Sequence, residues 1–207
     1  MLLAGGAARR FGGAPKGLAR IDGARIADRA LVALASASTR QLIVANDARA
    51  AVWFPGHHIV ADAEPDLGPL SGLVTALRAA DGLPVLVVAW DMPFVTGALL
   101  GALRRRGEVA VASDVPVHGP GLTAEPLCAY YRPEALAVAE TLLAGGARRA
   151  RALYEELTAA GAAVTMGDRA FDRFGNPARL FMSVDSPATL ALLGGMMPLA
   201  IEEAPAD

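Results

Sequence analysis

The sequence reads Val85-Leu86-Val87-Val88-Ala89-Trp90 near its middle, and every residue of this run is apolar. A strand that is apolar on both faces is typical of the centre of a parallel sheet, because helices cover both sides of such a sheet. Asp91, Met92 and Pro93 follow directly, and the proline ends the strand in a turn. This stretch predicts an α/β fold with a carboxylate at the end of its central strand.

Short apolar runs alternate with helical stretches on either side of this central strand. The apolar runs predict strands at residues 2–4, 41–45, 58–61, 84–89 and 108–112. Stretches rich in Ala and Leu predict helices at residues 24–37, 69–80 and 97–106. Strands joined by helices of this length form βαβ units, so we expect a mostly parallel, Rossmann-like sheet with helices on both faces.

The second half of the chain is less regular. It predicts a loop at 116–123, a strand at 127–131, helices at 133–143 and 147–160, a strand at 181–184 and a last helix that begins at Pro187 after the capping residue Ser186. Neither an internal repeat nor a linker-like stretch divides the sequence. We therefore expect one domain over residues 1–200 and a flexible tail at residues 201–207.

Charge and composition narrow the classes of partner. The net charge of −2 offers no surplus of Lys and Arg to hold a nucleic-acid backbone, and the same argument disfavours a membrane surface. The longest uninterrupted apolar run is far shorter than the ~20 residues that cross a bilayer. Cys128 is the only cysteine and cannot form an internal disulfide, so we expect a cytoplasmic protein.

A glycine-rich segment follows the first predicted strand and reads Leu3-Ala4-Gly5-Gly6-Ala7-Ala8-Arg9-Arg10-Phe11-Gly12-Gly13-Ala14-Pro15-Lys16. Glycines directly after a strand allow a sharp turn that points several N–H groups at one anion. Arg9, Arg10 and Lys16 add full positive charge beside them, which suits a polyphosphate. The segment is neither a Walker A loop nor a G-x-G-x-x-G fingerprint. A solvent-exposed basic turn is the alternative interpretation.

This segment, continued by Lys16-Gly17-Leu18, resembles the opening of nucleotidyltransferases that begin L-A-(G/A)-G-x-x-x-R-(M/F)-G-x-x-K. Within that superfamily, the two glycine pairs are most similar to those of the molybdenum cofactor guanylyltransferase family. Further motifs follow in the order and spacing of that family: Gly68-Pro69-Leu70-Ser71-Gly72-Leu73, Trp90-Asp91-Met92-Pro93-Phe94, Glu125-Pro126-Leu127 and Val184-Asp185-Ser186-Pro187. The resemblance thus runs through most of the chain.

The resemblance implies an α/β fold of the nucleotide-diphospho-sugar transferase type and a defined reaction. Enzymes of this family transfer GMP from GTP to molybdopterin, with or without molybdenum, and release pyrophosphate. It implies Mg²⁺ as the cofactor and molybdoenzyme maturation proteins as further partners. The residues to which it assigns nucleotide binding or catalysis in the opening segment are Leu3, Ala4, Gly5, Gly6, Arg10 and Lys16.

Three aspartates are candidates for the metal or the nucleotide. Asp91 lies at the sheet edge where ligands bind, so we expect a surface carboxylate that holds Mg²⁺, in line with the resemblance; a helix cap is the alternative. Asp62 follows the strand predicted at 58–61 and resembles the family's aspartate that contacts the nucleotide. Asp185 stands where the family has an asparagine at the metal site, and it either binds the metal or caps a helix.

Base recognition is expected in the same region. Guanine presents N–H donors that a carboxylate can accept, and Asp62 is the acceptor that we expect. In the family, a Gly-Gly pair accompanies the guanine enzymes and Ala-Gly the cytosine enzymes, so Gly5 points to GTP. Asn46 is a weaker candidate for nucleotide binding, because it lies one position out of the family's register.

Other polar residues carry a weaker signal. Three arginines near a predicted helix start oppose the charge preferred there and bind either an acceptor phosphate or solvent: Arg148, Arg149 and Arg151. No catalytic or metal role is expected where ligand spacing or a base partner is missing, which applies to His57, His58, His118 and Cys128.

Two rival functions remain open at the level of sequence. One is a transferase that uses CTP, or that acts on a sugar phosphate or an isoprenoid phosphate. The other is a nucleotide-binding regulatory module without activity. The presence of both Lys16 and Asp91 argues against the second.

Overall fold

A mixed sheet lies at the centre of the computed structural model, which describes residues 1–5, 9–62, 64–107, 113–118, 123–167 and 170–195. Its order is β10-β7-β9-β6-β1-β4-β5, with β8 paired to β7. The strands are β1 (Leu2–Leu3), β4 (Leu42–Val44), β5 (His58–Val60), β6 (Val85–Ala89), β7 (Ser113–His118), β8 (Thr123–Ala124), β9 (Cys128–Tyr131) and β10 (Ala163–Met166).

Most neighbours in this sheet run parallel. In β1, Leu2 pairs with Ile43 of β4 on one side and with Val88 of β6 on the other. β5 extends the parallel part, while β9 runs antiparallel to both β6 and β7. The predicted parallel sheet is therefore confirmed, and β1 takes its central place although it is only two residues long.

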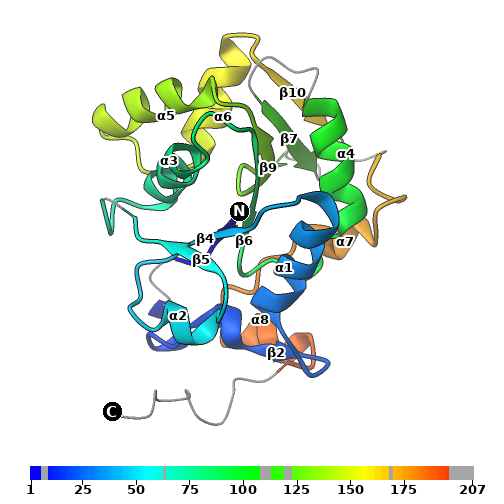
Figure 1. The fold of residues 1–207 in the computed structure, drawn as a ribbon. Helices are drawn as coiled ribbons and strands as arrows, with labels where there is room; N and C mark the ends of the chain where they lie inside the picture. Colours follow the sequence, from blue (N-terminus) through cyan, green and yellow to red (C-terminus); the bar gives the residue numbers. More distant parts are fainter. Residues whose placement is uncertain (6–8, 63, 108–112, 119–122, 168–169, 196–207) are drawn as a thin grey trace.

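Helices cover both faces of the sheet, as predicted (Figure 1). One face carries α1 (Ile26–Ala37) and α4 (Gly97–Gly107), and the other carries α3 (Pro69–Ala79), α5 (Ala135–Ala144) and α6 (Arg151–Ala159). Shorter helices lie at the periphery: α2 (Ala50–Trp53), α7 (Pro177–Leu180) and α8 (Pro187–Leu192). Among the described residues, no helix is long and apolar enough to cross a membrane.

Strand periodicity explains why β6 is apolar throughout. Successive side chains of a strand point to opposite faces. Leu86 and Val88 join the core beneath α1 and α4, whereas Val85 and Val87 join the core beneath α3, α5 and α6. All five residues of β6 are buried, so a polar residue at any of these positions would face one of the two cores.

A third, smaller core joins the two ends of the described chain. Phe11, Ile21 and Ile26 from the N-terminal part pack with Val184 and Leu190 from the C-terminal part. Ile21 belongs to a short hairpin of β2 (Arg20–Ile21) and β3 (Ala24–Arg25), which the sequence did not predict. This small core brings the glycine-rich segment and the segment before α8 to the same side of the molecule.

Several local predictions are corrected by the structure. Residues 181–184 are not a strand, because Phe181 packs edge-on against Phe171 and Val184 enters the small core instead of a ladder. The prediction of a loop at 116–123 is partly wrong, since residues 116–118 belong to β7 and Thr123 begins β8. The strand β10 was not predicted.

Other differences concern boundaries. The helix predicted from residue 24 starts at Ile26, because the two preceding residues pair in β3, and the helix predicted from residue 147 starts at Arg151. The strand predicted at 108–112 and the tail predicted at 201–207 lie outside the described residues. The single domain over residues 1–200 stays a prediction.

Candidate active site

Asp91 lies directly beyond the carboxyl end of β6, at the edge where parallel strands leave space for ligands. Its side chain is only 10% exposed, so the expected surface carboxylate is in fact largely buried. Its carbonyl accepts the N–H of Val184 (2.8 Å). Asp91 does not cap α4, because Thr96 Oγ1 accepts the N–H of Leu99 there (3.3 Å).

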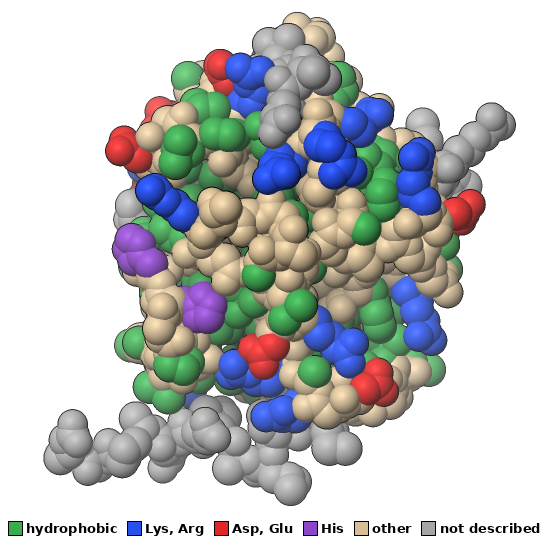
Figure 2. Space-filling model, turned by 45° about the vertical axis from the view of Figure 1, so that its right-hand side comes forward, with side chains coloured by type: hydrophobic (Ala, Val, Ile, Leu, Met, Phe, Trp, Pro, Cys, Tyr) green, Lys and Arg blue, Asp and Glu red, His purple; other side chains and the backbone are tan. Residues whose placement is uncertain are grey.

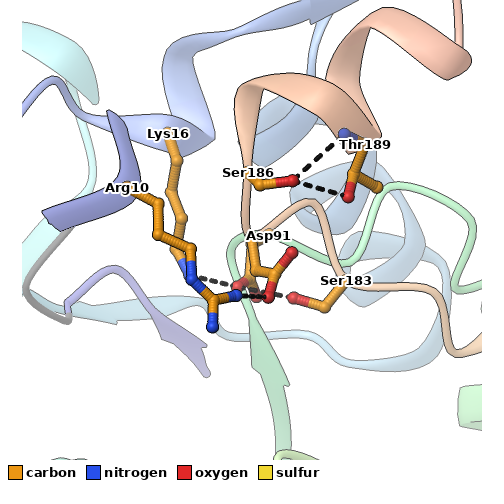
Figure 3. Close-up of polar contacts among 7 residues, drawn as sticks. Arg10, Lys16, Asp91, Ser183, Ser186 and Thr189 are labelled. Carbon is orange, nitrogen blue, oxygen red and sulfur yellow. Dashed lines mark hydrogen bonds and ion pairs between the residues drawn. The ribbon is translucent and has the colours of Figure 1, made fainter. Parts of the chain in front are cut away.

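Three chain segments meet at the Asp91 carboxylate (Figure 3). Lys16, in a 3-10 helix spanning Lys16–Leu18, forms an ion pair with Oδ2 of Asp91. Ser183 Oγ donates a hydrogen bond to the same oxygen (2.8 Å). Lys16 is 17% exposed, so this inner ion pair is shielded from bulk water. The small core explains the meeting, since it holds Val184, the neighbour of Ser183, beside the glycine-rich segment.

A second, outer ion pair lies beside the first. Arg10 belongs to a 3-10 helix spanning Arg9–Phe11 and pairs with Oδ2 of Asp185. Their side chains are 70% and 50% exposed. Asp185 is not the helix cap, because Ser186 Oγ accepts the N–H of Thr189 at the start of α8 (3.1 Å), as the sequence predicted for Ser186. The carboxylate of Asp185 is therefore linked to the glycine-rich segment by its ion pair with Arg10.

The donor set suits a divalent metal bound together with a polyphosphate. Carboxylate oxygens are the ligands that hard cations such as Mg²⁺ prefer, and Mg²⁺ is often held by one or two carboxylates plus substrate phosphates. Asp91 and Asp185 supply such carboxylates, while Lys16 and Arg10 supply positive charge for the phosphates. No group of three or more His, Cys, Asp or Glu side chains that could hold a metal occurs in the described part of the chain.

A cleft of about 270 Å³ opens beside Asp91 and Ser183. Its lining is mostly apolar, with two carboxylates, those of Asp91 and Glu125, and one guanidinium, that of Arg151. The remaining lining residues are Pro69, Ala89, Met92, Pro126, Leu127 and Ala150. The motifs Gly68-Pro69 and Glu125-Pro126-Leu127 thus both contribute to this cleft.

The start of α3 is fixed against the segment that carries the three arginines. Gly68 has φ +87, and a Cβ there would lie 2.8 Å from the carbonyl oxygen of Arg148. That oxygen also accepts the N–H of Leu70 (3.1 Å). The Arg148 guanidinium bonds the carbonyls of Leu143 and Ala147, whereas Arg151 lines the cleft and pairs with Glu155 (2.8 Å). The structure therefore brings Arg151, rather than Arg148, to the cleft.

Asn46 and Asp62, predicted separately, lie together. The N–H of Asp62 donates to Oδ1 of Asn46 (2.7 Å). Oδ1 of Asp62 accepts from Ser71 Oγ (2.7 Å) and Thr75 Oγ1 (2.9 Å), both on α3. Asp62 therefore ties the end of β5 to α3 through Oδ1, and no described residue donates a hydrogen bond to its Oδ2.

The first residues of the glycine-rich segment leave the sheet within the core. Leu3 and Ala4 are buried, and the Ala4 N–H donates to the Val44 carbonyl (2.8 Å), so this amide is not available to a phosphate. Gly5 is exposed, and a Cβ there meets no atom within 4 Å among the described residues. Gly6 and the side chain of Arg9 lie outside the description.

Two features of the site were missed by the sequence interpretation. Ser183 holds Asp91, but a single serine within the strand predicted at 181–184 carries no recognisable pattern. The other is visible in the composition: the chain has 19 Lys and Arg residues, and Lys16 is the only lysine among them. An ammonium is a compact point charge on a flexible stem, whereas a guanidinium is a planar fork. Lys16 was already a candidate from its motif, and its being the only lysine is a second reason to single it out.

The residues without an expected role lie elsewhere. Figure 2 shows histidine side chains at the surface, and its Lys and Arg side chains form separate groups rather than one basic band on the face drawn. Cys128 is fully buried in β9, and burial raises the pKa of its thiol. A thiol that resists deprotonation is a poor nucleophile, which agrees with a purely structural Cys128.

Comparisons with known proteins agree with this geometry. The MobA-like NTP transferase domain matches residues 1–163. A protein of Chloroflexus aggregans, named a probable molybdenum cofactor guanylyltransferase, is 32% identical over 93% of this chain and 91% of its own length. The molybdenum cofactor guanylyltransferase of Pseudomonas putida is 32% identical over 87% of this chain and 94% of its own length.

A solved structure is similar over the same range. The molybdopterin-guanine dinucleotide biosynthesis protein A from Archaeoglobus fulgidus superposes with a TM-score of 0.74 at 25% identity, covering 93% of this chain and 94% of that one. The family match covers most of the chain, including the glycine-rich segment and the buried Asp91. This chain belongs to the MobA-like NTP transferase domain family.

Proposed function

We propose that the protein is a nucleotidyltransferase that transfers GMP from GTP to molybdopterin, with Mg²⁺ as the cofactor and pyrophosphate as the leaving group. The observation that carries this proposal is the cluster of Lys16, Asp91 and Ser183 at the carboxyl end of β6, beside an open cleft. The names of the relatives that match over most of the chain support the same reaction.

The reaction forms a bond between an acceptor phosphate oxygen and the α-phosphorus of GTP, and it breaks the bond from that phosphorus to the bridging oxygen of the β-phosphate. Such a transfer needs positioning and charge neutralisation more than covalent catalysis. A bound metal ion would supply charge neutralisation at Asp91 and Asp185. The cations now paired with these carboxylates, Lys16 and Arg10, then become available to the triphosphate.

Gly5 supports the choice of guanine. Its φ is not in the left-handed region and a side chain there meets no described atom, so neither backbone strain nor packing among the described residues demands glycine at this position. The bare position leaves room for a large purine base, in line with the Gly-Gly pair that accompanies guanine enzymes in the family that the sequence resembles. The second oxygen of Asp62 is the proposed acceptor for the N–H groups of guanine, since the first is occupied by Ser71 and Thr75.

The cleft supports an acceptor that is partly apolar and carries a phosphate. Its lining includes Pro69, Met92 and Leu127, and Arg151 adds a cation to it. A planar heterocycle with a phosphate arm, as in molybdopterin, fits that combination. We place the reaction in the cytoplasm, because a buried free cysteine and no disulfide among the described residues suit a reducing compartment.

Turnover with each of the four NTPs and purified molybdopterin, followed by pyrophosphate release, tests the proposal. We expect GTP to be preferred over CTP by about 10⁴, since an unpaired polar group in a closed site is costly. Gly5→Ala should narrow this gap by lowering the rate with GTP. A sugar 1-phosphate serves as the control acceptor and should give no product.

Each outcome of this assay is decisive. CTP equal to or better than GTP would overturn the choice of guanine but keep the transferase. Turnover with the sugar phosphate and none with molybdopterin would overturn the choice of molybdopterin as the acceptor. A folded protein that binds GTP and turns over with neither acceptor would be a nucleotide-binding module.

A further inference from the structure

The loop that carries Lys16 rests on an indole ring. A Cβ added to Gly17 would lie 2.3 Å from Cε3 and 2.5 Å from Cδ2 of Trp90, and the three atoms nearest to it all belong to that ring. Side-chain carbons do not approach other atoms so closely, so only glycine permits this contact. Gly17 does not have a positive φ, so glycine is needed here because it lacks a side chain and not because of its backbone freedom.

Trp90 also belongs to the strand end that carries the metal-site carboxylate. Its backbone N–H donates to the Leu3 carbonyl (3.1 Å), and Asp91 is the next residue. Trp90 thus contacts the residue after Lys16 with its ring and precedes Asp91 in the chain.

The indole is itself fixed in the core beneath α1 and α4. Trp90 is 4% exposed, and its ring stacks on Trp53 with centroids 6.2 Å apart and an interplanar angle of 27°. Trp53 is in turn covered by the guanidinium of Arg49, which lies 5.0 Å from its ring centroid. A ring enclosed in this way cannot turn aside without disturbing its neighbours.

We propose that Trp90 is a positioning residue that sets the place of Lys16 over the reacting phosphates, through its contact with Gly17. This inference rests on the proposed function, which assigns Lys16 to the triphosphate. Displacement of a reacting group by about 1 Å can cost roughly 100-fold in rate. Loss of the indole, or a methyl group wedged against it, should therefore lower kcat more than it weakens GTP binding.

Five variants test the contact: Trp90→Phe, Trp90→Leu, Gly17→Ala, the double variant Trp90→Leu/Gly17→Ala, and the matched control Trp53→Leu. Trp53 is as buried as Trp90 and stacks on it, but it is not among the atoms nearest to Gly17. With GTP and molybdopterin, Trp90→Leu and Gly17→Ala should each lower kcat by roughly 30- to 100-fold, with KM for GTP changed less than about threefold.

The remaining variants sharpen the test. Trp90→Phe keeps an aromatic face against Gly17 and should retain most of kcat. In the Trp90→Leu background the steric conflict is gone, so Gly17→Ala should cause no further loss. Trp53→Leu should lower thermal stability about as much as Trp90→Leu, because a similar cavity forms, but it removes only a neighbour of the indole and leaves Trp90 against Gly17, so kcat should fall by less than about fivefold.

A second readout does not need turnover. Because Lys16 is the only lysine, competitive acetylation of amines followed by peptide mass spectrometry reports on one side chain besides the terminal amine. Lys16 should label faster in Trp90→Leu and Gly17→Ala than in wild type, and only slightly faster than wild type in Trp53→Leu, where the indole still faces Gly17.

The outcomes separate this inference from the function on which it rests. Equal effects of the two tryptophan variants on kcat and on labelling would show that only stability matters, and the inference would be wrong. If wild-type protein transfers no GMP, the proposed function fails. In that case the labelling pattern alone still decides whether the indole holds Lys16 in place.

Discussion

The two ion pairs of the site have the same charges but different surroundings. The inner pair, Lys16 with Asp91, is 17% and 10% exposed, and Ser183 donates to the shared oxygen. The outer pair, Arg10 with Asp185, is 70% and 50% exposed. Charges that water reaches are screened, whereas shielded charges act at nearly full strength on their neighbours.

We expect this difference to give the two pairs separate tasks. In the proposed reaction, the low local dielectric at the inner pair strengthens the action of an ammonium or a metal ion on a reacting phosphate. The outer pair should attract and orient a polyphosphate at the mouth of the site and contribute less to the reaction itself. The pairs also differ in their cation, since the inner one uses the only lysine of the chain.

The largest effect is expected at Asp91. Asp91→Asn removes the charge of the proposed metal ligand and leaves Lys16 without its partner, so kcat should fall by about 1,000-fold. Loss of one partner from a shielded pair should also cost about 3 kcal/mol of unfolding free energy. Steady-state kinetics across Mg²⁺ concentrations and urea denaturation measure the two effects. Near-normal turnover in a folded variant would show that Asp91 is not the metal ligand.

Lys16 should come next. Lys16→Ala should lower kcat by about 100-fold and raise KM for GTP much less, because the ammonium acts on charge that develops in the transition state. Lys16→Arg is the informative companion: a planar guanidinium beside Gly17 and Trp90 should restore charge but not activity. Intact kcat with a much poorer KM would instead mean that Lys16 only binds the ground state.

The outer pair should give the smallest changes. Arg10→Ala should raise KM for GTP by about tenfold and alter kcat little, and it should contribute less than about 1 kcal/mol to stability. Asp185→Asn keeps an oxygen that can reach a metal and should cost about threefold in kcat. Raising the ionic strength should reduce the effect of Arg10→Ala and leave that of Lys16→Ala unchanged. If salt reduced the effects of Arg10→Ala and Lys16→Ala equally, the inner pair would not be better shielded from water than the outer pair.

The central part of the fold could be predicted because its signals are local. The apolar run at 85–90, the alternation of strands and helices, and the cap at Ser186 each depend on neighbouring residues in the sequence. The prediction for residues 181–184 was wrong because its apolar residues are buried by the small core and not by a sheet. A run of buried apolar residues has the same appearance in a sequence whether it lies in a strand or in a loop packed against a core.

The site was predicted in part for a similar reason. Lys16, Asp91 and Arg10 stand in motifs, but their partners are set by tertiary contacts across long separations in the chain. Nothing local indicates that Ser183 supports Asp91, that Asp62 is anchored by Ser71 and Thr75, or that Gly17 lies under Trp90. These contacts also changed the interpretation of Asp91 from a surface group to a shielded one.

The small core of Phe11, Ile21 and Val184 has a consequence for how the protein is made. Chains emerge from the ribosome from the N-terminus, so the glycine-rich segment and Asp91 are exposed long before Ser183 and Asp185 are translated. Arg10 must wait for a partner 175 residues away. A growing chain can build most of its sheet early, yet the partners of Arg10 and Asp91 in the segment before α8 are among the later residues to be translated. The proposed nucleotide site should therefore form late in synthesis.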